Sequence, residues 1–462
     1  MSESLEFFGG VESVGDSFFA SFAGYGLLLL FVFCLIRRMP AATASIPFMS
    51  DGVSYATVTP VFSYVEWLII VSVFVVGILI TGSLKSERIG RVKGFLKLKP
   101  IGAVFLIMIY ISFKSVIDVF WLGLDDSRKA GLLLLIPNVL LPLLIIIFSV
   151  PIYGLVNTLR QFMFGGYLGS LIWLATGLVG SLSDISLAEF FVGKRLTFHG
   201  STMIHSVRLI PLFLWASIFW FLKVPRISVR IFIVVALGIV LTALSLNGTR
   251  QYALSVFAAM VFTAVLLPQR AMRIGLFGAT AGIVAVLFLD NFWEIVPLRQ
   301  RSTIDQVGSD GRLAIWSDSF EYASQRPWFG GGFRTYGEES VHRSLTTGYE
   351  SLAKDNAHGL FADVAVDHGI IISICLAILY LLLCLHLFRL AIKLKNADLS
   401  LIVVGVIALP LSLLFSGTFW TAFYFAVPIA FVLWLPSYQD LEFTKLRIGS
   451  QKGLGSIGSH RH

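Results

Sequence analysis

Charged residues are scarce in this chain of 462 residues, where Asp, Glu, Lys and Arg together make up 13%. Soluble globular domains are about a quarter charged, so this scarcity excludes an ordinary soluble protein. Hydrophobic residues supply 56% of the chain. They recur in runs of about 20 residues, which suffice to cross a hydrocarbon core roughly 30 Å thick. Because backbone groups find no water there, each run is predicted to be helical, and the fold class to be an all-α polytopic membrane protein.

Cysteine is scarce as well. The three cysteines, Cys34, Cys375 and Cys384, all lie in apolar runs. They have neither the spacing of metal ligands nor that of a disulfide framework. Because the acidic residues of the polar segments are scattered along the sequence, we expect no dedicated metal site and no cofactor.

Basic residues are absent from the first 17 residues, which instead hold four acidic residues. A secretory signal peptide begins with a basic region, so this N-terminus has the opposite character. The first apolar run, about 18–36, is therefore expected to remain in the protein as a spanning helix.

Apolar runs occur twelve times and predict twelve transmembrane helices. They cover about 18–36, 65–84, 101–123, 131–150, 163–182, 206–222, 231–248, 250–267, 274–290, 369–388, 400–416 and 418–436.

The net charge of +8 comes largely from short loops between these runs. The loop 85–99 holds six basic residues, and 223–230 and 389–395 hold three each. This distribution indicates membrane orientation rather than nucleic-acid binding, because basic loops face the cytoplasm. All of these loops fall on one side when twelve helices span the membrane and both termini are cytoplasmic.

The predicted topology leaves one large periplasmic loop, residues 291–368, within a membrane domain that covers residues 1–440. This loop holds seven Lys or Arg residues, eleven Asp or Glu residues and three of the eight histidines. The Gly/Ser-rich tail, residues 441–462, is expected to be disordered in the cytoplasm. A transporter commonly has inverted repeats and a polar site near the midplane. Here the polar residues gather on one side, and no repeat is visible.

Lys114 and Asp118 form the one clear charged pair inside a predicted span. Their i,i+4 spacing places both side chains on one helix face, where they can neutralise each other. A structural pair is the simpler interpretation, and an ion path is the alternative.

Arg250, in "NGTR", stands between two apolar runs at the external end of a span. A charge at membrane depth is costly, and an anionic partner would offset that cost. The planar fork of arginine suits a phosphate. A side chain that reaches out to the lipid headgroups is the alternative.

The stretch "GRLAIWSDSFEYASQRPWFGGGF" follows later in the chain. Apolar residues at Leu313, Ile315, Trp316 and Phe320 predict an amphipathic helix over 312–323 that lies on the membrane surface. The proline and the three consecutive glycines after it predict a turn.

The stretch "KDNAHGLFADVAVDHGI", residues 354–370, joins a polar segment to an apolar run. A helix over 356–370 would place several small side chains on one narrow face suited to close packing. That face carries His358, Phe361, Ala362, Ala365 and Gly369. His368 would lie elsewhere on the helix and is expected to tolerate alanine far better than His358. Taken alone, a histidine at a membrane boundary is structural more often than catalytic.

Together these segments resemble the O-antigen ligase and polymerase family. In that family an "SR" ends one span, "R-x-x-x-W" opens the large periplasmic loop, "P-x-x-G-x-G" follows, and "HN…E-x-G" leads into the next span. This chain keeps that order over about 245–375: "NGTR" is followed by "GRLAIW", then by "PWFGGGF", and then by His358 with Asp367 and Gly369. Gly359 departs from the family, which usually has Asn there, so a polar contact of that Asn is missing.

The resemblance implies glycan transfer at the periplasmic face of a bacterial inner membrane. The donor would be a glycan on undecaprenyl diphosphate, and the acceptor a sugar hydroxyl on another lipid-linked glycan or on lipid A-core. The resemblance implies that His358 is the general base and that Arg250 and Arg312 bind the leaving diphosphate. Arg195, in "GKRLTFHGST", is a further candidate for the diphosphate, because this segment is similar to the family's earlier periplasmic loop.

The implied partners are the lipid-linked substrates and membrane lipid, with no nucleic acid. A glycan polymerase is the first interpretation and a lipid A-core ligase the second, since both use the same site. A transporter or flippase is the alternative from another class. A flippase would need a charged cavity among the spans, which carry almost no central charge apart from Lys114 and Asp118.

Overall fold

The fold is described by a computed structural model. It describes residues 14–46, 60–84, 99–123, 128, 131–132, 135–184, 209–247, 250–267, 312–337, 357, 359–413 and 422–435. Within these ranges the chain forms helices and turns and no β-strand, which confirms the predicted all-α class.

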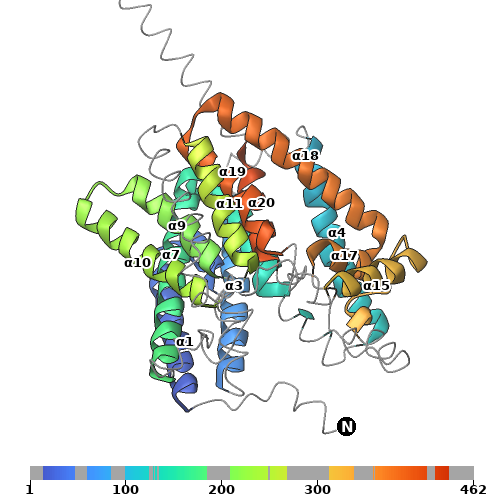
Figure 1. Cartoon of the computed structure of the whole chain (residues 1–462), viewed down its shortest axis with the longest axis horizontal. Coiled ribbons are helices and arrows are strands. Elements are labelled where there is room, and N and C mark those ends of the chain that lie inside the picture. Colours follow the sequence, from blue (N-terminus) through green and yellow to red (C-terminus); the bar gives the residue numbers. More distant parts are fainter. Residues whose placement is uncertain are drawn as a thin grey trace, which may run out of the picture.

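The larger group of helices forms the main bundle (Figure 1). It comprises α1 (Val14–Ile36), α3 (Pro60–Leu84), α6 (Leu141–Tyr153), α7 (Leu155–Asp184), α9 (Leu209–Lys223), α10 (Ile227–Asn247), α11 (Arg250–Leu266), α19 (Ala397–Ala408) and α20 (Phe423–Val432). Helix α7 packs between α1 and α9, α3 packs on α6, and α19 contacts both α11 and α20. Short helical turns complete the group: η2 (Pro40–Ala44), η4 (Ile136–Leu140) and η7 (Leu409–Leu413).

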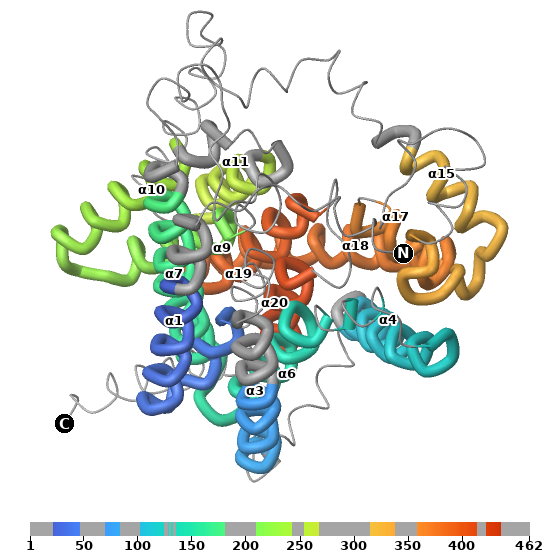
Figure 2. Tube along the Cα trace, turned by 90° about the horizontal axis from the view of Figure 1, so that it is seen from below, coloured from blue at the N-terminus to red at the C-terminus, as the bar shows by residue number. Residues whose placement is uncertain are grey.

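A smaller group lies to one side of this bundle. It comprises α4 (Lys99–Leu122), α15 (Arg312–Gln325), α17 (Leu360–His368) and α18 (Ile370–Leu394). Helix α18 contacts α4, α17 and α19, and α15 packs on α17. Figure 2 shows α4, α15 and α17 together on the side away from α1 and α10. Helix α18 therefore connects the two groups.

Four helical stretches of the described residues are long and apolar enough to cross a membrane. They are Gly102–Leu122, Ile136–Tyr153, Leu155–Gly180 and Ile370–Leu394. Seven shorter apolar helices accompany them in the described ranges. The chain is thus a multi-pass membrane protein. The count of twelve spans stays a prediction, and the predicted span 274–290 lies outside the described residues.

Two of the basic loops meet at one end of the structure. Lys223, at the end of α9, forms an ion pair with Asp398, in the first turn of α19, at 2.6 Å between Nζ and Oδ1. The segments 223–230 and 389–395 are therefore close together, as expected for loops on one side of the membrane. Helices α15 and α17 lie at the opposite, N-terminal end of α18 (Figure 1).

Candidate functional site

The turn after α15 packs directly on the junction between α17 and α18. The backbone N–H of Gly331 donates to the carbonyl of Val366 at 2.8 Å, and that of Gly332 donates to the carbonyl of Asp367 at 3.2 Å. The N–H of Ile371 donates to the carbonyl of Pro327 at 3.2 Å. The turn predicted from "PWFGGGF" is confirmed, and it pairs with the "DHG" segment more than thirty residues later.

Two glycines allow this close approach. A Cβ atom on Gly331 would lie 1.9 Å from the hydroxyl of Tyr322 in α15. Gly369 has φ +102°, and a Cβ atom there would lie 2.7 Å from the carbonyl oxygen of Pro327. A side chain on Gly369 would push the turn away from the helix junction, and one on Gly331 would push it away from α15.

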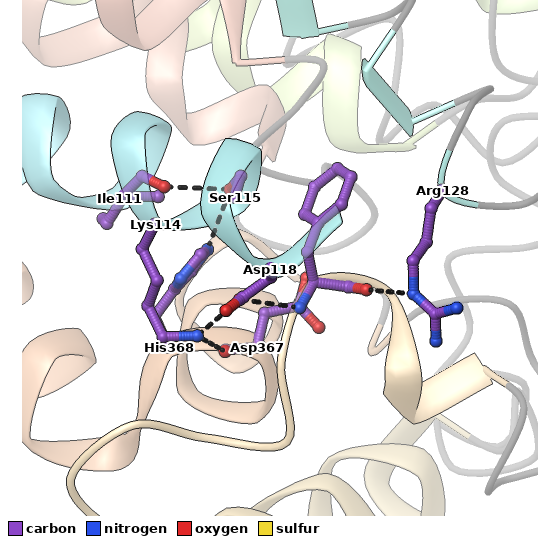
Figure 3. Close-up of polar contacts among 8 residues, drawn as sticks. Ile111, Lys114, Ser115, Asp118, Arg128, Asp367 and His368 are labelled. Atoms are coloured by element: carbon purple, nitrogen blue, oxygen red, sulfur yellow. Dashed lines mark hydrogen bonds and ion pairs between the residues drawn. The ribbon is translucent and has the colours of Figure 1, made fainter. Parts of the chain in front are cut away.

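Lys114 and Asp118 of α4 reach the same turn (Figure 3). Asp118 Oδ2 accepts hydrogen bonds from the backbone N–H of Phe333 at 3.0 Å and from Lys114 Nζ at 2.5 Å. Lys114 Nζ also donates to the carbonyl oxygen of Asp367 at 3.2 Å. The pair therefore does more than neutralise itself, because each member binds the backbone of a different segment.

Further polar contacts surround this pair (Figure 3). The Arg128 Nε–H group donates to the carbonyl oxygen of Phe333 at 3.3 Å. Ser115 Oγ lies 3.5 Å from His368 Nε2 and donates to the carbonyl oxygen of Ile111 at 2.9 Å. His368 is 1% exposed. This burial indicates a structural role for His368, and its expected tolerance of alanine relative to His358 stays a prediction.

Burial controls the ionisation of the two residues that end α17. It raises the pKa of the Asp367 carboxyl well above its usual range, and the neighbouring Asp363 raises this pKa further. A hydrogen bond from the Arg334 backbone and the charges of Arg334 and Lys114 oppose that shift. Burial lowers the pKa of His368 well below its usual value, and the positive charge of Lys114 adds to this effect. His368 is therefore a neutral imidazole at pH 7.

Helix α15 buries one face against α17. A small apolar cluster joins the two helices and the segment after the turn: Tyr322, Ala323, Tyr336, Ala357, Ala362, Ala365 and Val366. The Tyr336 hydroxyl donates to Asp318 Oδ2 at 2.7 Å. The close packing predicted for the small residues of α17 is confirmed. The helix predicted over 312–323 is confirmed as α15, and its place on the membrane surface stays a prediction: Ile315 is buried, whereas Phe320 is 44% exposed.

A comparison with protein families matches residues 233–377 to the O-antigen ligase family. The match covers less than half of the chain and supports a relation to the O-antigen ligase and polymerase family. We call residues 233–377 the O-antigen ligase segment. It begins within α10, contains α11, α15 and α17, and ends in the first turns of α18. The family supports a membrane enzyme that transfers glycans and uses lipid-linked glycan and acceptor substrates in general. No curated protein matches the chain.

Three of the four predicted site residues lie within the O-antigen ligase segment: Arg250, Arg312 and His358. Arg250 is the first residue of α11, and Arg312 is the first residue of α15. Both side chains lie outside the described residues, as do His358 and Arg195 as a whole. The helix predicted over 356–370 is wrong at its ends, because α17 starts at Leu360 after an extended Gly359 and stops at Gly369.

Lys114, Asp118 and Arg128 lie outside the O-antigen ligase segment, and no sequence pattern connects them with it. The signal was a lysine and an aspartate in an apolar run, where ionisable residues are expensive and usually have a specific partner. Their partners Phe333 and Asp367 contribute backbone atoms, which no side-chain pattern reveals. Within the described ranges, no three His, Cys, Asp or Glu side chains are placed to hold a metal ion.

Proposed function

We propose that the protein is a glycosyltransferase that acts at the periplasmic face of a bacterial inner membrane. It moves a glycan from undecaprenyl diphosphate to a sugar hydroxyl, as an O-antigen or exopolysaccharide polymerase. The observation that carries this proposal is the pairing of the "PWFGGGF" turn with the "DHG" junction through Gly331, Gly332 and Ile371. Two of the motifs that resemble the family, "PWFGGGF" and the segment that ends at Gly369, thereby lie in direct contact.

The arginines are proposed to bind the diphosphate. Arg250 and Arg312 each occupy the first position of a helix, α11 and α15. The free N–H groups and the dipole of a helix N-terminus favour an anion there, and an arginine at that position adds a bidentate donor. As the glycosidic bond breaks, negative charge grows on the leaving diphosphate, and these donors stabilise it. Arg195 is proposed as a third ligand from the earlier loop.

His358 is proposed as the general base that takes the proton of the acceptor hydroxyl. It stands immediately before Gly359, the N-cap of α17, and α17 is fixed by its packing on α15 and by its hydrogen bonds to the turn. An imidazole with a pKa near ~6.5 suits this task. His368, the other histidine of this stretch, is buried and in contact with Ser115, which makes it unsuitable as a base for a diffusing acceptor.

The position of α17 supports a site at the membrane boundary. Only Gly369 separates α17 from α18, whose residues Ile370–Leu394 are apolar and long enough to cross the membrane. A base that precedes α17 would thus stand near the headgroups, where the lipid diphosphate lies. The acceptor glycan would reach it from the aqueous side.

The test is to incubate the purified protein with a glycan linked to undecaprenyl diphosphate, alone and together with lipid A-core. Longer lipid-linked glycans are expected and would support the polymerase. Transfer to lipid A-core alone would support a ligase, the second candidate, which the description of the matching family favours. Movement of the lipid across vesicle membranes without any transfer would instead support a flippase.

A further inference from the structure

We propose that Lys114 and Asp118 are positioning residues of the transferase: α4 uses them to hold the turn 326–332 and the end of α17 in their active arrangement. This inference rests on the proposed function, because the held segments follow Arg312 and His358 in the chain. It adds to the site two residues outside the segment that matches the O-antigen ligase family.

The contacts connect α4 with segments far away in the sequence. Asp118 binds Phe333, 215 positions later, and Lys114 binds the carbonyl of Asp367, 253 positions later. Phe333 follows the glycine turn directly, and Asp367 is the last but one residue of α17. One ion pair on one face of α4 therefore holds both the turn, through Phe333, and the end of α17, through Asp367.

The backbone of Phe333 is held from both sides. Its N–H group donates to Asp118, and its carbonyl oxygen accepts from Arg128. Its side chain is 2% exposed, and Leu122 of α4 lies beside the neighbouring Gly332. A peptide unit bound at the N–H, the carbonyl and the side chain has little freedom, so the turn keeps one position relative to α4.

The ion pair is well suited to this task. The side chains of Lys114 and Asp118 are 13% and 15% exposed. Loss of one partner would leave the other as an unpaired charge at low dielectric, which is strongly unfavourable. The pair is therefore stable only when complete, and in that state each member has hydrogen-bonding capacity left for the backbone of another segment.

The purpose of this arrangement follows from the demands of glycan transfer. The base and the diphosphate ligands must stand within hydrogen-bond reach of one substrate, and a displacement of 1 Å can cost about 100-fold in rate. Arg312 begins α15, which leads into the turn, and His358 stands two residues before α17. A turn that leaves α4 would disturb both helices, although neither Lys114 nor Asp118 would touch the reacting atoms.

A charge swap separates positioning from simple neutralisation. Lys114→Glu with Asp118→Lys keeps an i,i+4 ion pair, now with the acid on the N-terminal side, which is the better orientation in a helix. However, a lysine at 118 cannot accept the N–H of Phe333, and a glutamate at 114 cannot donate to the carbonyl of Asp367. The swap thus keeps the neutral pair and removes both contacts with the other segments.

Two measurements are made on the swapped protein. The first is the steady-state kinetics of glycan transfer, where kcat is expected to fall about 10- to 100-fold, with a smaller rise in KM for the lipid donor because Arg312 is displaced as well as His358. The second is limited trypsin digestion, followed by mass spectrometry of the fragment that ends at Arg334. Cleavage after Arg334 is expected to accelerate several-fold, because this residue follows Phe333 and becomes accessible when the turn leaves α4.

A second ion pair supplies the control. Lys223 and Asp398 pair at 2.6 Å and connect α9 with α19, at the end of the structure away from the turn. The corresponding swap, Lys223→Glu with Asp398→Lys, is expected to leave kcat and the cleavage after Arg334 unchanged. If the first swapped protein does not accumulate, Lys114→Met with Asp118→Asn takes its place. This variant is neutral, keeps an acceptor for Phe333, and is expected to show smaller changes of the same kind.

A swapped protein with the kcat and the tryptic pattern of the wild type would show that the pair only neutralises itself, and would overturn the proposal. Faster cleavage with an unchanged kcat, or a lower kcat with unchanged cleavage, would overturn it as well. A wild-type protein that transfers no glycan would refute the proposed function. The digestion would still show whether the pair holds the turn.

Discussion

Asp118 and Phe333 are separated by 215 positions in the sequence, and the carboxylate of one accepts the backbone N–H of the other at 3.0 Å. Asp118 belongs to α4, and Phe333 belongs to the segment predicted to lie outside the membrane. Residues 312–337, the described stretch of the predicted loop 291–368 that contains Phe333, therefore do not form an independent domain. Its turn is attached to a membrane helix by the hydrogen bond from the Phe333 N–H to Asp118 and to α17 by backbone hydrogen bonds.

The first prediction concerns the glycines at this attachment. Gly331→Ala and Gly369→Ala are each expected to destabilise the protein by about 1–3 kcal/mol, because of contacts with Tyr322 and Pro327 and, at Gly369, a positive φ. Gly77→Ala is the control, since a Cβ atom there meets nothing within 4 Å. Thermal unfolding in detergent measures the effect. Equal stability of all three variants would show that the close approach at the turn does not exist.

The sequence predicted the helices well because their signal is local. Long apolar runs bounded by basic or glycine-rich loops determine α4, α7 and α18 without reference to the rest of the chain. The start of α17 was misplaced, since it was predicted at 356 and found at Leu360. Helical periodicity gave the buried faces but no boundary, since Gly359 caps the helix in an extended conformation.

The candidate site was predictable only in its motifs. The turn at "PWFGGGF" and the closely packed Ala362 and Ala365 followed from composition and spacing. The connection from Lys114 and Asp118 to this turn did not follow. It depends on backbone atoms brought together by the tertiary fold, whereas the i,i+4 spacing of the pair already offered a sufficient local explanation.

The second prediction concerns pH and His368. Burial lowers the pKa of His368, so below its unfolded value of about 6.5 the unfolded state binds more protons than the folded state. The stability due to a neutral His368 is thus fully present above that pH and is lost as the pH falls towards the lowered pKa. The raised pKa of Asp367 acts with the opposite sign, since its stability is lost as the pH rises from about 3.9 through the raised pKa.

His368→Gln isolates the histidine. Glutamine can still contact Ser115 but does not titrate, so the difference in thermal stability between wild type and variant should shrink as the pH falls from about 7.5 to about 5. Thermal unfolding in detergent across this range is the measurement. A difference that stays constant with pH would mean that His368 is not buried as a neutral side chain.

The third prediction concerns topology. Reporter fusions at residue 340 and at the C-terminus are expected to report opposite compartments, the periplasm for the first and the cytoplasm for the second. The reason is the positive-inside distribution of the short loops, two of which meet through Lys223 and Asp398. A result in which both fusions report the same compartment would exclude the twelve-span topology.

The fourth prediction concerns the arginines. Arg250→Ala and Arg312→Ala are expected to abolish glycan transfer while the protein accumulates normally in the membrane. Lysine at either position should restore only part of the activity, because its ammonium group cannot donate the two parallel hydrogen bonds of a guanidinium. Transfer assays on membranes with matched protein amounts provide the measurement. Full activity of an alanine variant would remove that arginine from the site.

The last prediction concerns His358. Loss of a general base commonly costs about 10²- to 10⁴-fold in rate, so His358→Ala should be nearly inactive in chain extension. It should still bind the lipid donor, because the diphosphate is proposed to be bound by arginines and not by the imidazole. His342→Ala is the matched control: this histidine belongs to the same polar segment, 291–368, but to none of the motifs that resemble the family. A paired assay of both variants for extension and for donor binding decides the role. Wild-type extension by His358→Ala would contradict it, and so would an inactive His342→Ala beside an active His358→Ala.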